Sequence, residues 1–314
     1  MKILFLAKID YSGLTEGMSR AFRKKNFSTQ IFDTKRYRKI DKYFKRDFSF
    51  QKFEKKLKEF CPDTIFLIAP MFLKREYFEI IDKFKEKNKL KVVGWVGDSF
   101  KKEKENIEKL SLIDRLYYTD TGFFDIYSAD NVEYLPLATD PKIFIEKGFI
   151  YKNKYNCSFV ASRTPGRASF LKELKCCVDV FGPGWNNNGI QGKAHNFKST
   201  KLHISKVSNI YARSRMVLNL KNENNVINGL NQRSFDPCAA GSLLLHDYVA
   251  DIDLNYEVGK EILVFRSEEE FSELYKKCMI DSEFRRKISE NGRKRVASCH
   301  TFTDRVEKVL SGLG

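Results

Sequence analysis

The sequence predicts an α/β protein with two domains, each built around a parallel sheet. The chain has 314 residues, which is enough for two domains with separate hydrophobic cores. Short apolar runs of strand length alternate with stretches of helical spacing, and this order is typical of parallel sheets covered on both faces. The alternation stops at residues 138–155, a polar stretch that contains Pro141, and then starts again. Two similar α/β halves facing each other would leave a cleft at the carboxyl edges of their strands.

The first half is expected to hold six strands separated by helices. The expected strands are KILFLA (2–7), STQIFD (28–33), DTIFLIA (63–69), KVVGWVG (91–97), RLYYTD (115–120) and VEYLPLA (132–138). Three intervening stretches have clear helical spacing, namely residues 14–25, 48–60 and 75–88. Cys61-Pro62 is expected to end the second of them, because proline cannot continue a helix.

The second half repeats the alternation and then becomes helical. The expected strands are NCSFVA (156–161), VDVFG (178–182), MVLNL (216–220) and SLLLHD (242–247). The expected helices between them cover residues 166–177, 203–214 and 232–240. Three successive helices should close the chain, over residues 267–281, 282–300 and 301–312. We therefore assign a first domain to residues 1–140, a linker to 141–154, a second domain to 155–296, and a terminal helical segment that packs back on the first domain to 297–314.

Charge and cysteine content limit the partners and the compartment. The chain carries 57 Lys and Arg against 41 Asp and Glu, a net charge of +16. Such a charge favours anionic partners, namely phosphorylated ligands, nucleic acid or an anionic membrane surface, although it also fits a merely soluble surface. The seven cysteines are scattered and form no CxxC pair, which indicates a reducing compartment. Too few apolar residues precede Lys8 for a signal peptide, so we expect a cytoplasmic protein that could contact a membrane surface.

Several common catalytic motifs are absent from the sequence. It contains no GxGxxG, GxSxG, HExxH or GxxxxGK[ST] pattern, so dinucleotide-binding, hydrolase-triad, metalloprotease and P-loop interpretations lack support. The four histidines show no spacing typical of metal ligands. We expect no metal and no cofactor.

Two positions of the first half could contribute to a site. Gly13 lies in the loop after the first strand, where it could let an anionic ligand approach the start of the next helix; an ordinary turn is the alternative. Asp98 follows the strand that contains Trp95 and could present a carboxylate at the carboxyl edge of the sheet. The alternative for Asp98 is an N-cap of a helix starting near Lys101.

Two loops of the second half could hold an anion and a flat ring. Arg163 and Arg167 flank Pro165-Gly166 after the first strand of this half, where two arginines could clamp a diphosphate. The alternative is a solvated basic turn. Gly182-Pro183-Gly184 ends the next strand, and close-fitting backbone of this kind could lie against a nucleobase or form a rigid turn.

The stretch GLNQRSFDPCAAGSLLLHD, residues 229–247, is the strongest candidate for a ligand pocket. Asn231, Arg233 and Asp236 are expected on the first turns of a helix, with Arg233 and Asp236 on one face because they are three residues apart. The small residues that lead to Gly241 would let this helix pack tightly on the sheet. A carboxylate beside a helix N-terminus suits a ribose diol, which offers two hydroxyl donors. A surface ion pair is the alternative.

These motifs together resemble a known family. The order SFVASRTPGR, VDVFGPGW, NQRSFDPCAAGSLLLHD and YEVGKEILVF is similar to that of CgeB-like glycosyltransferases of the spore-maturation-protein type, which belong to the GT-B superfamily near family 4. The resemblance covers nearly all of the second half and, more loosely, GWVGDS and VEYLPLATDPKIF in the first. It implies a GT-B fold: two Rossmann-like domains, the second holding a nucleotide-sugar and the first holding the acceptor.

The resemblance also implies roles for particular residues. In GT-B enzymes with an E-x7-E motif, the second glutamate binds the ribose and stands five positions before a glycine. Asp236 stands at that position, five residues before Gly241. Asn228 stands where the first glutamate is usual. Because of this departure, the resemblance does not identify the carboxylate that would contact the sugar. The basic residues already named would neutralise the diphosphate in place of a metal. Asp98 is the catalytic or acceptor-side candidate, and Glu261 matches a recurrent acidic position of the sugar-donor domain.

The sequence therefore predicts a glycosyltransferase that moves a sugar from a nucleotide-sugar, such as a UDP-sugar, to an acceptor hydroxyl. By analogy with the family we expect retention of configuration and no metal. The acceptor could be a glycan, a lipid-linked glycan, a protein or modified DNA. The alternative is a non-catalytic protein of the same fold that binds nucleotide or nucleic acid, which the substitution of Asn228 for glutamate favours.

Overall fold

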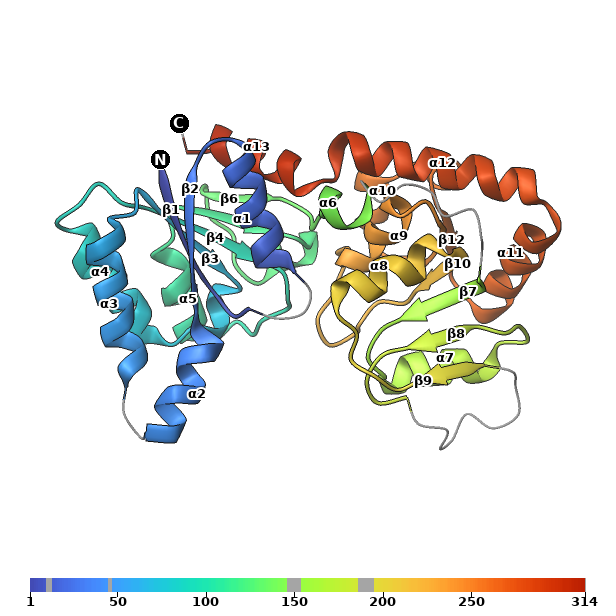
Figure 1. Ribbon diagram of the computed structural model, residues 1–314, viewed down its shortest axis with the longest axis horizontal. Coiled ribbons are helices and arrows are strands. Elements are labelled where there is room, and N and C mark those ends of the chain that lie inside the picture. The colour runs from blue at the N-terminus through green and yellow to red at the C-terminus, as the bar shows by residue number, and fades with distance from the viewer. Residues whose placement is uncertain (10–12, 45–46, 146–153, 186–194, 314) are drawn as a thin grey trace. The chain divides into compact units, whose positions relative to one another are not determined.

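A computed structural model describes residues 1–9, 13–44, 47–145, 154–185 and 195–313 of the chain (Figure 1). The chain divides into two compact units. The first comprises Met1–Pro136 together with Phe302–Gly314, and the second comprises Leu137–Thr301. The boundary lies at Pro136 and Leu137, before the stretch that the sequence marked as a linker, and the short helix α6 (Pro141–Phe144) belongs to the second unit. Residues 146–153 of that stretch lie outside the described residues.

The first unit is built on a six-stranded parallel sheet in the order β2-β1-β3-β4-β5-β6. Its strands are β1 (Lys2–Ala7), β2 (Ser28–Asp33), β3 (Thr64–Ile68), β4 (Lys91–Val96), β5 (Arg115–Tyr118) and β6 (Val132–Tyr134). Its helices are α1 (Leu14–Lys24), α2 (Thr34–Phe44), α3 (Phe48–Phe60), α4 (Arg75–Lys85), α5 (Lys104–Ser111) and α13 (Phe302–Ser311), with short 3₁₀ turns at Pro70–Phe72 and Thr121–Asp125. The last helix of the chain, α13, lies beside α1 on this sheet (Figure 1).

The second unit repeats this architecture around a parallel sheet in the order β12-β11-β10-β7-β8-β9. Its strands are β7 (Tyr155–Val160), β8 (Asp179–Phe181), β9 (Asn196–Lys198), β10 (Ser214–Asn219), β11 (Leu243–Asp247) and β12 (Leu263–Phe265). Besides α6, its helices are α7 (Pro165–Glu173), α8 (Ile204–Ala212), α9 (Asp236–Ala239), α10 (Ile252–Asn255), α11 (Glu268–Ile280) and α12 (Ser282–Cys299), and a 3₁₀ turn covers Gln232–Ser234.

Each sheet has its own hydrophobic core. In the first unit the strands β1, β3 and β4 are buried over nearly their whole length, as their continuous apolar runs predict for strands covered on both faces. In the second unit β10 and β11 are buried in the same way. The predicted alternation of strand and helix is therefore confirmed in both halves.

Two predicted helices differ from the observed ones. The stretch 232–240, expected to be one helix, consists of the 3₁₀ turn and the four-residue helix α9, because Phe235 interrupts the turn and Gly241, with φ of 88°, ends α9. The helix expected near Lys101 begins instead at Lys104, with Glu103 at its N-cap. Asp98 is therefore not a helix cap.

In the described part of the chain, no helix combines the length and apolar character needed to cross a membrane.

Candidate functional site

The candidate site lies at the point where the strand order of the second sheet reverses. From β7 the chain proceeds outward to β8 and β9, whereas from β10 it proceeds the other way to β11 and β12. The loops that leave the carboxyl ends of β7 and β10 therefore run in opposite directions. In open α/β sheets such a switch point is where ligands bind.

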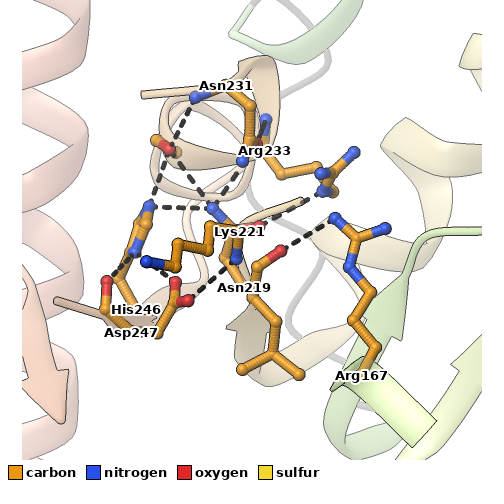
Figure 2. A network of polar contacts seen from close by, with 9 residues as sticks. Arg167, Asn219, Lys221, Asn231, Arg233, His246 and Asp247 are labelled. Atoms are coloured by element: carbon orange, nitrogen blue, oxygen red, sulfur yellow. Dashed lines mark hydrogen bonds and ion pairs between the residues drawn. The ribbon is translucent and has the colours of Figure 1, made fainter. Parts of the chain in front are cut away.

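Asn219, the last residue of β10, joins the segments around this point. Its side chain is fully buried. Its amide Nδ2 lies 3.2 Å from Ser234 Oγ and 2.8 Å from His246 Nε2, while its Oδ1 accepts a hydrogen bond from Arg233 Nε at 3.2 Å (Figure 2). Asn231 Oδ1 caps the 3₁₀ turn by accepting from the Arg233 N–H at 2.9 Å. One buried amide thus positions Arg233 relative to the sheet.

The end of β11 completes this network. His246 is buried, with its Nε2 2.8 Å from Ser234 Oγ and its Nδ1 3.1 Å from Asp247 Oδ1. Asp247 Oδ2 accepts a hydrogen bond from the Lys221 N–H at 2.9 Å, which ties the loop after β10 to β11. These contacts hold both strand ends in a fixed relation.

Two guanidinium groups converge beside Asn219. Arg167, on the first turn of α7, is only 4% exposed and donates to Ser162 O at 3.0 Å and to Leu220 O at 2.9 Å. Figure 2 shows its guanidinium facing that of Arg233. The pKa of Arg167 is lowered to about 9, first by burial and second by the positive charge of Arg233. The Nε–H of Arg167 is buried without a hydrogen-bond acceptor. Two close cations with an unused donor form a site suited to an anion.

A cavity of about 480 Å³ is lined by Arg167 but not by Arg233, and its volume is in the usual range for small-molecule sites. It lies over the ends of β7, β10, β11 and β12 and the starts of α7 and α11. Its lining residues are Thr164, Gly166, Arg167, Ser169, Phe170, Leu220, Lys221, Glu223, Asp247, Tyr248, Phe265, Arg266 and Glu268. Arg266 stacks on the Tyr248 ring, with its guanidinium carbon 3.6 Å from the ring centre.

The Gly-Pro-Gly turn braces the loop that leads to Arg167. Gly182 has φ of 135°, and a Cβ there would lie 2.2 Å from Ala161 O. The same carbonyl accepts a hydrogen bond from Trp185 Nε1 at 2.7 Å, and the Arg163 N–H donates to Pro183 O at 3.0 Å. The glycine is therefore required for the close approach of two backbone segments.

The other predicted residues of these two loops are placed nearby but differ in exposure. Gly184, with φ of 84°, lies against Arg163, whose Cβ would be 3.2 Å from a Cβ at Gly184. The Arg163 side chain is exposed, in contrast to that of Arg167. The two arginines that the sequence pairs in one loop therefore differ: Arg167 is a buried cation and Arg163 lies at the surface.

Asp236 is placed inside the second unit. It is 3% exposed, its Oδ1 accepts a hydrogen bond from Thr139 Oγ1 at 2.7 Å, and burial raises the pKa of its carboxyl well above the ordinary range. It is not a surface partner of Arg233 and does not line the cavity. The small residues after it serve the close packing of α9 on β11 and α12.

Three further predicted positions do not line the cavity. Asn228 follows the loop after β10, where its carbonyl accepts from the Asp251 N–H at 3.0 Å. Gly241 forms the turn between α9 and β11. Glu261 precedes β12, at the amino edge of the sheet, where its carboxylate lies 3.7 Å from Arg295 Nε. The structure therefore does not bring Glu261 to the switch point.

In the first unit, Gly13 and Asp98 follow the carboxyl ends of β1 and β4, strands separated by β3. Gly13 adopts φ of 71° at the N-cap of α1, which explains the glycine. Asp98 is half-buried. Between them, Ala69 at the end of β3 also adopts a left-handed conformation, with φ of 53°, at the switch point of this sheet. Non-glycine residues with a left-handed backbone are found more often near functional sites than elsewhere.

The sequence interpretation missed Asn219, Lys221, His246 and Asp247 of the network, and Glu223 of the cavity lining. A signal for them exists, since each is a polar residue at or just beyond the end of an apolar run that was assigned to a strand. Among the described residues, no group of three or more His, Cys, Asp or Glu side chains is placed to hold a metal ion.

Comparison with solved structures defines the class of fold. The chain is similar to sucrose-phosphate synthase from Thermosynechococcus elongatus (TM-score 0.71, 8% identity, 100% of this chain and 99% of that one). It is similar to Anabaena HepE in complex with UDP and glucose (TM-score 0.68, 11% identity, 99% of each chain). It is also similar to a DNA-modifying β-glucosyltransferase studied with and without uridine diphosphoglucose (TM-score 0.63, 15% identity, 99% of this chain and 100% of that one). The chain thus has the GT-B fold of two Rossmann-like domains.

The family comparison agrees with this class. Residues 163–311 match a family model described as "Glycosyl transferase-like". Among curated proteins, none matches the chain significantly. The fold and the family match together support a glycosyltransferase.

Proposed function

We propose that the protein transfers a sugar from a nucleotide-sugar to an acceptor hydroxyl, and that the second unit binds the nucleotide-sugar. The convergence of Arg167 and Arg233 at the switch point of the second sheet carries this proposal. Both residues lie in the stretch that matches the glycosyl transferase-like family. The similarity to structures that contain UDP or UDP-glucose supports a UDP-sugar as the sugar donor.

In the proposed reaction, the bond between the anomeric carbon and the diphosphate breaks, and a bond from that carbon to the acceptor oxygen forms. The acceptor hydroxyl loses its proton, and the leaving nucleoside diphosphate gains negative charge. Preorganised cations stabilise this charge as it develops. Arg167 is held by two backbone carbonyls and Arg233 by Asn219, so neither guanidinium needs to reorganise when the anion is present. We propose that these cations act without a metal.

The finer features of the proposal follow the resemblance of the sequence. We propose a CgeB-like enzyme related to family 4 that retains the anomeric configuration and works in the cytoplasm, with possible acceptors on a cell-surface glycan, a glycolipid, a protein or DNA. Asp98, half-buried at the end of β4, is the proposed acceptor-side catalytic residue of the first unit. The net charge of +16 suits a polyanionic acceptor or contact with an anionic membrane.

The test is the binding of UDP measured by calorimetry. Arg233→Ala should weaken UDP binding about 10-fold or more, because charge-assisted hydrogen bonds to the phosphates are lost, while binding of uridine stays unchanged. Arg286→Ala removes the same charge from the exposed surface of α12 and is the matched control. The proposal would be refuted by UDP affinity that Arg233→Ala leaves unchanged. A non-catalytic protein of this fold is the alternative, and hydrolysis or transfer of sugar from any UDP-sugar excludes it.

A further inference from the structure

Glu223 lies over the first turn of α7. It belongs to the loop after β10, and its two carboxylate oxygens lie 2.9 and 3.1 Å from the position that a Cβ would take at Gly166. The residue is exposed, and with the other described residues it forms no hydrogen bond or ion pair. Its carboxylate therefore lies against Gly166, but no hydrogen bond or ion pair with the described residues fixes it there.

The surroundings of this carboxylate attract anions. At the start of α7, Pro165 has no N–H and the Arg167 N–H donates to Thr164 Oγ1, so the Gly166 N–H is the unused donor of the first turn. The buried side chain of Arg167 lines the same cavity as Glu223, and its Nε–H has no acceptor. The first turn of α7 and the buried cation Arg167 thus border the same cavity as the carboxylate.

We propose that Glu223 occupies, in the ligand-free protein, the place that a phosphate group of the ligand takes against Gly166 and Arg167. The inference rests on the proposed function and adds a residue that sets the affinity of that site. A carboxylate and a phosphate compete for this place because both are anions attracted by the same buried cation and helix N-terminus. Binding then requires the Glu223 side chain to move away.

Glu223 suits this role better than the other acidic residue close to Arg167. Asp247 accepts a hydrogen bond from the Lys221 N–H and lies 3.1 Å from His246 Nδ1, so the network fixes it in place. Glu223, in contrast, is the flexible end of an exposed side chain on a loop. Gly166 offers space for the exchange because it carries no side chain.

The test compares the binding of UDP and of uridine to wild type and to Glu223→Gln by calorimetry. Removal of the competing charge should tighten UDP binding by about 3-fold to 10-fold, the usual scale for one partly exposed charge, and leave uridine binding unchanged. The gain should shrink at high ionic strength because salt screens exposed charges. Glu268→Gln, which removes one charge from the start of α11 in the lining of the same cavity, is the matched control and should change UDP binding much less.

A second variant tests the position itself. Gly166→Ala places a methyl carbon against the carboxylate, 2.9 Å from its nearer oxygen, and Gly166 has no left-handed backbone angle that would oppose alanine. It should weaken UDP binding several-fold both alone and together with Glu223→Gln, because the phosphate needs the same space. UDP affinity that is unchanged in Gly166→Ala overturns the inference.

The outcomes separate this inference from the proposed function. If wild type binds UDP but Glu223→Gln binds it no more tightly, or if Glu268→Gln has an equal effect, only the inference is overturned. Weaker UDP binding by Glu223→Gln would show that the carboxylate contacts the ligand, which also overturns it. If neither wild type nor the variants bind UDP, the proposed sugar-donor site is wrong and the inference falls with it.

Discussion

Replacement of Gly182 by alanine should destabilise the second unit strongly. The backbone of Gly182 has φ of 135°, a conformation almost confined to glycine. The added methyl carbon would lie 2.2 Å from Ala161 O, which is backbone and cannot rotate away. Alanine at this position therefore forces the β7 loop and the Gly-Pro-Gly turn apart.

The size of the effect can be worked out from these contacts. The unfavourable φ costs about 1–3 kcal/mol. Separation of the two segments also breaks the bonds from Trp185 Nε1 to Ala161 O and from the Ala161 N–H to Phe181 O, at about 1 kcal/mol each. Gly182→Ala should thus lower the free energy of unfolding by about 3–5 kcal/mol and the melting temperature by about 10 °C.

Differential scanning calorimetry of the variant measures this change, with Gly259→Ala as the matched control. Gly259 has φ of 82°, but nothing lies within 4 Å of a Cβ built there. Its replacement carries only the cost of the backbone angle, about 1–2 kcal/mol. The reasoning is refuted if Gly182→Ala costs no more than Gly259→Ala, since the clash with Ala161 would then contribute nothing.

Two further predictions concern a buried carboxyl and the role of metals. The folded protein raises the pKa of Asp236 above its unfolded value near 4, chiefly by burial, so this group contributes stability at low pH that is lost as pH rises through its folded pKa. Asp236→Asn keeps an acceptor for Thr139 Oγ1. The melting temperature of this variant relative to wild type should rise between pH 4.5 and pH 8. A difference in melting temperature that does not depend on pH would contradict the raised pKa of Asp236. Sugar transfer should survive EDTA if, as we propose, Arg167 and Arg233 neutralise the diphosphate. Loss of activity that Mn²⁺ restores would count against this proposal.

The sequence predicted the elements of the fold where the evidence is local. Continuous apolar runs identified β1, β3, β4, β10 and β11, because a strand covered on both faces buries nearly all of its side chains. The last three helices were also predicted close to their observed bounds. Residues 232–240 were misread as one helix, because the spacing of apolar residues does not reveal the interruption at Phe235.

The candidate site was predicted only in part, for a related reason. The sequence singled out Arg167 beside Pro165-Gly166 and Arg233 on the first turn of an expected helix, and the structure brings the two together. It could not show that Arg163 is exposed while Arg167 is buried, or that Asp236 bonds to Thr139, 97 residues earlier in the chain. These distinctions depend on which segments pack against one another.

What the sequence determined by itself is the repeated α/β organisation and the glycine, arginine and asparagine positions at the strand ends. These follow from the chemistry of neighbouring residues, which fixes periodicity, helix caps and turns. The strand order of each sheet was decided by the tertiary structure alone, because it depends on contacts between distant segments. That order places Asn219 beside His246 and Leu220 beside Arg167, and so creates the proposed anion site and the position of Glu223 next to it.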